Sequence, residues 1–208
     1  DTARWYMLSD SPPERDLEWN ETGVEGAWRY LNRLWRLVAE APMELAPVDG
    51  AKPDRMDPAV AAVHQAVHKA IHATTGDLER FHFNRAVARI RELTNDLDEL
   101  DETMAGAAWV MREGLETIVR LIGPMAPHLA EELWQRLGHE ALLTDTPWPD
   151  ADSALLTDDT VTVAVQVNGK LRATIELDRD AAKDAAEAAA LADPAIIRAL
   201  DGKAPRRV

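Results

Sequence analysis

The sequence predicts a mainly α-helical protein, in which an antiparallel helical bundle is followed by a small α+β domain with a β-hairpin. Apolar residues recur at spacings of three and four from about residue 23 to residue 137, which is the period of amphipathic helices. Prolines and glycines separate these segments, as expected for long helices joined by short breaks. After about residue 160 the apolar period changes to two, which is typical of strands.

The helical part begins with a short helix over residues 1–10 and a proline-containing loop over residues 11–16. Longer helices are predicted over residues 23–41, from Pro58 onward, and over residues 84–100, 104–122 and 127–137. Asp57 is a suitable N-cap for the helix that starts at Pro58, and Thr75-Gly76 either interrupts or kinks that helix. We therefore expect a connection over residues 1–20 and the bundle over residues 21–138.

An acidic linker is predicted over residues 139–159, because residues 139–160 contain six acidic residues, no lysine or arginine, and two prolines. A small α+β domain should follow over residues 160–208, with the boundary near residue 155. Valines at 161, 163, 165 and 167 recur at every second position, and Asn168-Gly169 then separates them from a second run of period two, which is a strong hairpin signal. Two short helices are expected after the hairpin.

The register of this hairpin is decided by its loop. A two-residue loop would pair Val165 with Arg172 and would mix valines with cations on one face. A three-residue loop, with Gly169 in a left-handed bulge, would pair Val165 with Leu171 and Val163 with Ala173 instead. Because one face must be buried, we predict the bulged, three-residue loop.

The net charge of −14 argues against a general nucleic-acid binder, since phosphate attraction favours basic proteins. Only a local basic patch could overcome the repulsion between such an acidic chain and nucleic-acid phosphates. Arg29, Arg33 and Arg36 lie at i, i+4 and i+7 of one predicted helix, within an acid-free run from Ala27 to Ala39. This stripe is either a solvated helix face or a series of phosphate contacts. The side chains expected to bury the opposite side are those of Trp28, Leu31 and Trp35.

Two further groups have less distinctive patterns. His64, His68 and His72 recur every four residues, but the outer two are too far apart for one ion and no carboxylate or cysteine joins them, so we predict no metal site. Acidic residues adjoin a second arginine group, for which we favour a salt-bridged helix face over a ligand site; its members are Arg80, Arg85, Arg89 and Arg91.

Lys170 and Arg172 flank the hairpin turn, where they either meet RNA or keep an edge strand soluble. No glycine-rich phosphate loop, Ser/His/Asp arrangement or paired carboxylates in a credible cleft are found, and there is no cysteine, so no catalytic residue is predicted. A different class of function remains open, namely a helical protein–protein interaction module that uses a tryptophan-rich face with Trp28 and Trp35 as anchors.

Several segments resemble, in the same order, the C-terminal part of bacterial-type leucyl-tRNA synthetases: residues 1–5, 11–19, 23–27, 124–134 and 165–172. The proline–histidine helix at 124–134 is also similar to that of isoleucyl, valyl and methionyl enzymes, so the equivalent region of another class Ia synthetase is an alternative. The order of the Ser-Pro-Pro loop, the Gly-Val-Glu-Gly segment and the Val-Asn-Gly-Lys hairpin selects the leucyl family. An isoleucyl enzyme would carry zinc-binding cysteines.

The resemblance implies a class Ia anticodon-binding fold that positions tRNA(Leu) for leucylation. Catalysis, with ATP and Mg²⁺, would belong to catalytic and editing domains outside this chain, which would itself hold no cofactor. The resemblance also implies a cytoplasmic monomer, and a further strand beyond Val208. Arg29 and Arg33 match basic positions of the family's tRNA-facing helix, and His68-Lys69 matches a family pair, whereas Arg85 replaces the usual threonine. The predicted tRNA contacts are Arg29, Arg33, Arg36, His68, Lys69, Lys170 and Arg172.

Overall fold

The computed structural model describes residues 1–157 and 160–200. The chain divides into two compact units, residues 1–156 and residues 157–208. Part of the small domain expected over 160–208, namely residues 201–208, lies outside the described residues.

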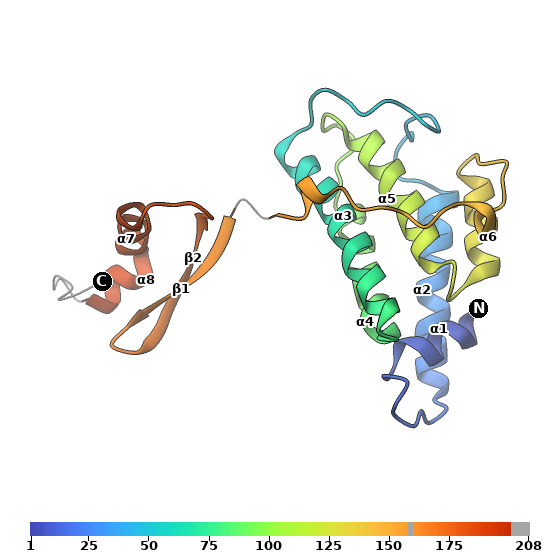
Figure 1. Cartoon of the computed structure of the whole chain (residues 1–208), viewed down its shortest axis with the longest axis horizontal. Coiled ribbons are helices and arrows are strands. Elements are labelled where there is room, and N and C mark those ends of the chain that lie inside the picture. The colour runs from blue at the N-terminus through green and yellow to red at the C-terminus, as the bar shows by residue number, and fades with distance from the viewer. Residues whose placement is uncertain (158–159, 201–208) are drawn as a thin grey trace. The chain divides into compact units, whose positions relative to one another are not determined.

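The first unit is a helical bundle, as predicted (Figure 1). Its helices are α1 (Thr2–Ser9), α2 (Glu21–Ala39), α3 (Pro58–Glu79), α4 (Phe83–Asp98), α5 (Ala107–Ile122) and α6 (Pro127–Arg136). A corner of three residues joins α3 to α4, and the two helices pack side by side and antiparallel. The helix α3 continues through Thr75-Gly76 to Glu79, so of the two alternatives for this pair the interruption is wrong.

The residues that precede α2 and α3 act in different ways. Asn20 accepts a hydrogen bond from the backbone N–H of Gly23 at 3.2 Å, so α2 begins at Glu21, earlier than the apolar pattern indicated. Asp57 is the N-cap residue of α3, but its carboxylate accepts from the backbone N–H of Ala105 at 2.8 Å instead of from its own helix. Asp57 thereby ties the start of α3 to the segment before α5.

The short helix α1 belongs to the core of this unit. The ring of Trp5 is fully buried and stacks on Tyr30 of α2 with a centroid distance of 5.2 Å. The hydroxyl of Tyr30 lies 2.9 Å from Oγ1 of Thr94 in α4. These contacts join α1, α2 and α4 through one aromatic pair.

The segment expected to be a linker packs along the bundle (Figure 1). We call residues 139–156 the strap; it contains two short 3-10 turns, Leu143–Asp145 and Ser153–Leu155. The indole Nε1 of Trp148 donates to Oγ1 of Thr75 at 2.8 Å. The carboxylate of Glu131 accepts the backbone N–H groups of Leu143 and Thr144 at 2.8 and 2.9 Å. The strap is thus held by hydrogen bonds to α3 and α6.

The second unit contains the predicted hairpin, β1 (Thr160–Val167) and β2 (Lys170–Asp178), followed by α7 (Lys183–Ala192) and α8 (Pro194–Leu200). The predicted register is wrong. Asn168 and Gly169 both have positive φ, 54° and 75°, and form a two-residue loop that pairs Val167 with Lys170.

A bulge does occur, but farther from the turn. Gln166 pairs with Leu171 and Val165 pairs with Ala173, which leaves Arg172 as the extra residue of β2. The pairs beyond it are Val163 with Ile175 and Val161 with Leu177, so apolar residues still face apolar partners. The two-residue turn matches the strand twist, and the displaced bulge restores the apolar face that the three-residue loop was expected to provide.

Candidate nucleic-acid interface

The arginine stripe of α2 lies opposite the side that α2 buries. The buried side chains of this helix are Ala27, Tyr30, Leu31, Leu34 and Leu37. Arg29 is exposed and its Nη1 lies 3.2 Å from Oε1 of Glu25, in an ion pair whose partners are 60% and 61% exposed. Arg36 is exposed and makes no ion pair with any residue that the structure describes. Because an exposed i, i+4 ion pair is weak, the guanidinium of Arg29 is available to a polyanion, as is that of Arg36.

Arg33 differs from its two neighbours in the stripe. Its Nε donates to Oδ2 of Asp98 at 3.0 Å and its Nη2 donates to Oδ1 of Asn95 at 2.8 Å. It therefore joins α2 to the end of α4, and its charge is balanced locally. A phosphate would have to displace these partners, which makes Arg33 a weaker candidate than the family resemblance implies.

The tryptophans of α2 do not bury the opposite side of the helix as expected. Trp28 is 55% exposed, which corrects the prediction for this residue. Trp35 is half-buried, and the guanidinium of Arg136 lies 4.3 Å from its ring centroid. Both rings lie on a flank between the core and the stripe, because a step of seven residues nearly completes two helical turns.

The histidines of α3 meet a carboxylate that the sequence analysis did not connect to them. Glu113 of α5 approaches Nε2 of His64 with Oε2 at 3.3 Å and Nε2 of His68 with Oε1 at 3.5 Å. One possible metal-ligand atom from each of the three residues lies within 4.8 Å of the other two. The expectation that no carboxylate joins the histidines is therefore wrong. His72, the third histidine of the pattern, is exposed and not part of this cluster.

The hydrogen bonds of His68 favour a structural role for this cluster over a metal site. The backbone N–H of Asp152 in the strap donates to Nδ1 of His68 at 3.0 Å. Nδ1 is therefore an acceptor, and the neutral ring carries its proton on Nε2, where it faces Glu113. A metal-bound histidine normally donates from its second nitrogen to an acceptor, which is the reverse of this arrangement.

Glu113 is held as a carboxylate. Burial alone would raise its pKa, but the close contacts with the rings of His64 and His68 outweigh that effect, and the pKa is lowered from its ordinary value. The side chain of His68 is 12% exposed and uses both ring nitrogens inside the protein. Direct contact of His68 with RNA would break these bonds. Lys69, its neighbour, is half-buried.

Near the corner between α3 and α4, Asp77 forms ion pairs with two of the arginines that were predicted to form a salt-bridged face. The Asp77 side chain is 5% exposed, and its Oδ1 lies 3.4 Å from Nε of Arg85 while its Oδ2 lies 3.9 Å from Nε of Arg89. Arg89 also pairs with Glu92 at 3.4 Å, as the sequence analysis expected. Asp77 itself was missed, because nothing in the helical pattern marks a buried carboxylate.

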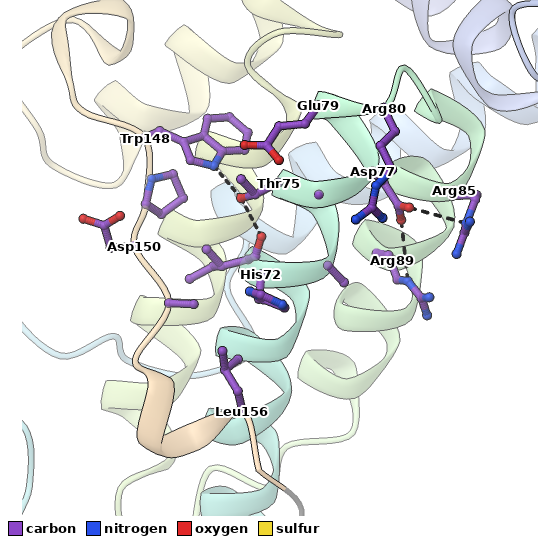
Figure 2. A pocket seen from close by; sticks show the side chains of 15 residues that line it. His72, Thr75, Asp77, Glu79, Arg80, Arg85, Arg89, Trp148, Asp150 and Leu156 are labelled. Carbon is purple, nitrogen blue, oxygen red and sulfur yellow. Dashed lines mark hydrogen bonds and ion pairs between the residues drawn. The ribbon is translucent and has the colours of Figure 1, made fainter.

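These groups line a pocket of about 530 Å³ (Figure 2). Arg80, Arg85 and Arg89 lie on one side of it with Asp77, whereas Trp148, Glu79 and Asp150 lie on the other side. The pocket therefore has a basic half on α3 and α4 and a mixed half that includes the strap.

In the second unit, Lys170 and Arg172 are both exposed. Lys170 is the first residue of β2 and Arg172 is the bulged residue, so both lie close to the turn.

Across residues 1–157 and 160–200, none of the helices has the length and the apolar character of a membrane-spanning segment.

Comparisons with known proteins agree with the resemblance seen in the sequence. Residues 62–187 match the anticodon-binding domain of tRNA ligase. The whole chain is 60% identical to a leucine–tRNA ligase of Paramagnetospirillum magneticum and 52% identical to one of Rhodospirillum rubrum, and it covers 24% of each relative. The chain thus spans about a quarter of the length of the curated relatives it matches.

A solved structure is also similar over the whole chain. It is the LeuRS of Agrobacterium radiobacter K84 in a ternary complex with tRNA and LeuAMS, which matches with a TM-score of 0.78 at 29% identity, over 27% of that protein. The matched region of the relatives is their C-terminal part. The chain belongs to the family of anticodon-binding domains of tRNA ligases, in the form found in leucyl-tRNA synthetases.

Proposed function

We propose that this chain binds tRNA(Leu) and positions it for leucylation by the catalytic part of a leucine–tRNA ligase. The observation that carries the proposal is the run of residues 27–39 in α2, which holds three arginines and no acid in a chain of the leucyl family with a net charge of −14. ATP and Mg²⁺ would serve the catalytic part, and no residue of this chain is assigned to them. The proposed setting is a cytoplasmic monomer.

The proposed contacts of α2 follow from how each arginine is held. Arg29 and Arg36 contact backbone phosphates, because one has only an exposed, weak ion pair and the other has no charged partner among the described residues. Arg33 mainly links α2 to α4. Lys170 and Arg172 are the proposed tRNA contacts of the second unit. Lys69 remains a proposed tRNA contact of the first unit, whereas His68 positions the strap.

The test is a titration of labelled tRNA(Leu), and of a second tRNA, with the 208-residue chain over a series of salt concentrations. Arg29→Gln and Arg36→Gln should each weaken binding about tenfold and lower the salt slope by about one unit, because each removes a phosphate contact. Arg33→Gln should change binding less. Arg15→Gln and Arg55→Gln are controls, since both arginines are exposed and lack ion pairs with described residues.

A second candidate function rests on the exposed ring of Trp28, which is what a protein-interaction face would present. A protein-interaction function predicts the opposite outcome of the tRNA titrations. Trp28→Ala would abolish capture of a protein partner, and the chain would show no salt-dependent affinity for either tRNA. Such an outcome would exclude the proposal of tRNA binding.

A further inference from the structure

We propose that the corner between α3 and α4 is an RNA contact distinct from the stripe of α2, in which Arg85 and Arg89 hold one backbone phosphate and Phe81 stacks on an adjacent nucleobase. This inference rests on the proposed function and names the chemistry of a site that the family resemblance did not supply. It is carried by the arrangement around Asp77 and by the conformation of Phe81.

Asp77 orients the two guanidiniums. A buried carboxylate needs charged or hydrogen-bonding partners, and Asp77 meets Arg85 and Arg89 through their Nε atoms, with Nδ1 of His82 at 4.0 Å. Because each arginine uses its Nε side toward Asp77, its terminal nitrogens remain for another acceptor. Among the described residues, Arg85 has no ion-pair partner other than Asp77, and Nη1 of Arg89 pairs with the exposed Glu92 at 3.4 Å.

The spacing of the two arginines suits a single phosphate. Arg85 and Arg89 lie at i and i+4 on α4, so they emerge from the same side of consecutive turns. A phosphodiester has two unesterified oxygens, and the planar fork of each guanidinium matches such oxygens. Figure 2 shows both side chains on the basic half of the pocket, away from Glu79 and Asp150. A phosphate on this half is therefore kept apart from the two carboxylates on the other half.

Phe81 supplies the second observation. It occupies the left-handed region with φ of 61°, where residues other than glycine are strained, and 64% of its surface is exposed. Folding thus gains little from this side chain, apart from an edge contact to Phe83 with ring centroids 5.8 Å apart. Phe81 lies in the same α3–α4 corner, four residues before Arg85 in the chain, and an exposed aromatic ring is a usual means of stacking an unpaired base.

The experiment measures the affinity of the 208-residue chain for tRNA(Leu) over a salt series. Arg85→Gln and Arg89→Gln should each weaken binding about tenfold. The double variant should weaken it by less than the product of the two single effects, because both residues contact one phosphate. Its salt slope should fall by about one unit and not by two. The double variant Arg15→Gln/Arg55→Gln is the matched control and should leave both quantities unchanged.

Removal of both arginines leaves Asp77 buried without its cations, which by itself can unfold the corner. The triple variant Asp77→Asn/Arg85→Gln/Arg89→Gln avoids this, because no buried charge remains unpaired. It should keep the melting temperature and still show the loss of tRNA affinity. Addition of inorganic phosphate at the same ionic strength should weaken tRNA binding by the unaltered chain more than by the triple variant.

Phe81→Gly separates a binding role from a folding role. Glycine is unstrained at this φ and little buried surface is lost, so the variant should be at least as stable as the unaltered chain. We nevertheless expect it to weaken tRNA binding several-fold. Unchanged affinity and salt slope in the triple variant and in Phe81→Gly would overturn this inference while the chain still binds tRNA. If the unaltered chain binds no tRNA, the proposed function is overturned together with it.

Discussion

A pair of glycine substitutions provides a sharp test of how closely α4 and α5 are packed. Gly114 lies in α5, and a Cβ atom added there would come within 2.5 Å of Cδ2 and 2.8 Å of Cδ1 of Leu97 in α4. Leu97 is fully buried, so its side chain has no free space to move into. Gly26 lies in α2, and an added Cβ there would have no atom within 4 Å. The two glycines are therefore matched in helical position and differ in available space.

The magnitudes follow from two opposing effects. Replacement of a helix-interior glycine by alanine stabilises the helix by about 0.5–1 kcal/mol at either position. At Gly114 the added methyl also overpacks the contact with Leu97, which costs about 1–3 kcal/mol. Gly26→Ala should thus stabilise the first unit by about 0.5–1 kcal/mol, whereas Gly114→Ala should be neutral or destabilising by up to about 2 kcal/mol.

Urea denaturation followed by helical circular dichroism gives the two free energies of unfolding. The difference between the variants should be about 1–3 kcal/mol in favour of Gly26→Ala, with equal m-values. If Gly114→Ala is as stable as Gly26→Ala, the described contact between α4 and α5 is not tightly packed, and the reasoning is refuted.

The remaining predictions concern single side chains. Tyr30→Phe should cost about 1 kcal/mol by removing the hydroxyl contact to Thr94. Burial raises the pKa of Tyr30 from 10.0 to about 12, so its contribution to stability should decline between pH 10 and 12 in the unaltered chain and not in the variant, as urea denaturation would show. Because the pKa of Glu113 is lowered, its contribution should be lost as the pH falls through the acidic range, and Glu113→Gln should flatten that limb of the stability profile. Gly169→Ala, at a φ of 75°, should destabilise the hairpin by about 1 kcal/mol and speed its amide exchange without affecting the bundle.

The helices could be predicted from the sequence because their signal is local. In α4, Val87, Ile90, Leu93 and Leu97 recur at helical spacing, and all four are buried. The hairpin was equally clear from alternation and from Asn168-Gly169, but its register was not. Two loops competed, and the prediction assumed that the bulge had to lie in the turn. The chain instead keeps the favoured two-residue turn and bulges at Arg172.

The contacts that organise the candidate site could not be predicted, because they join residues far apart in the chain. Glu113 lies about 50 residues from the histidines that it binds, and no periodic pattern links an acid on one helix to a histidine on another. The strap was misjudged for a similar reason. Its acidic, proline-containing composition is typical of a linker, yet backbone hydrogen bonds to His68 and Glu131 hold it on the helices.

The net charge of −14 does not determine how this chain meets RNA, because many of its acids already have partners inside the protein. Asp77, Asp98 and Glu113 each face arginine or histidine side chains, and Glu131 accepts backbone N–H groups. Charges interact strongly only within about 8 Å at physiological ionic strength. Arg85 and Asp98 stand 13 residues apart on α4, or about 20 Å along the helix, so the α3–α4 corner and the stripe near Asp98 present largely independent fields. Each arginine group can therefore attract a phosphate according to its own neighbours.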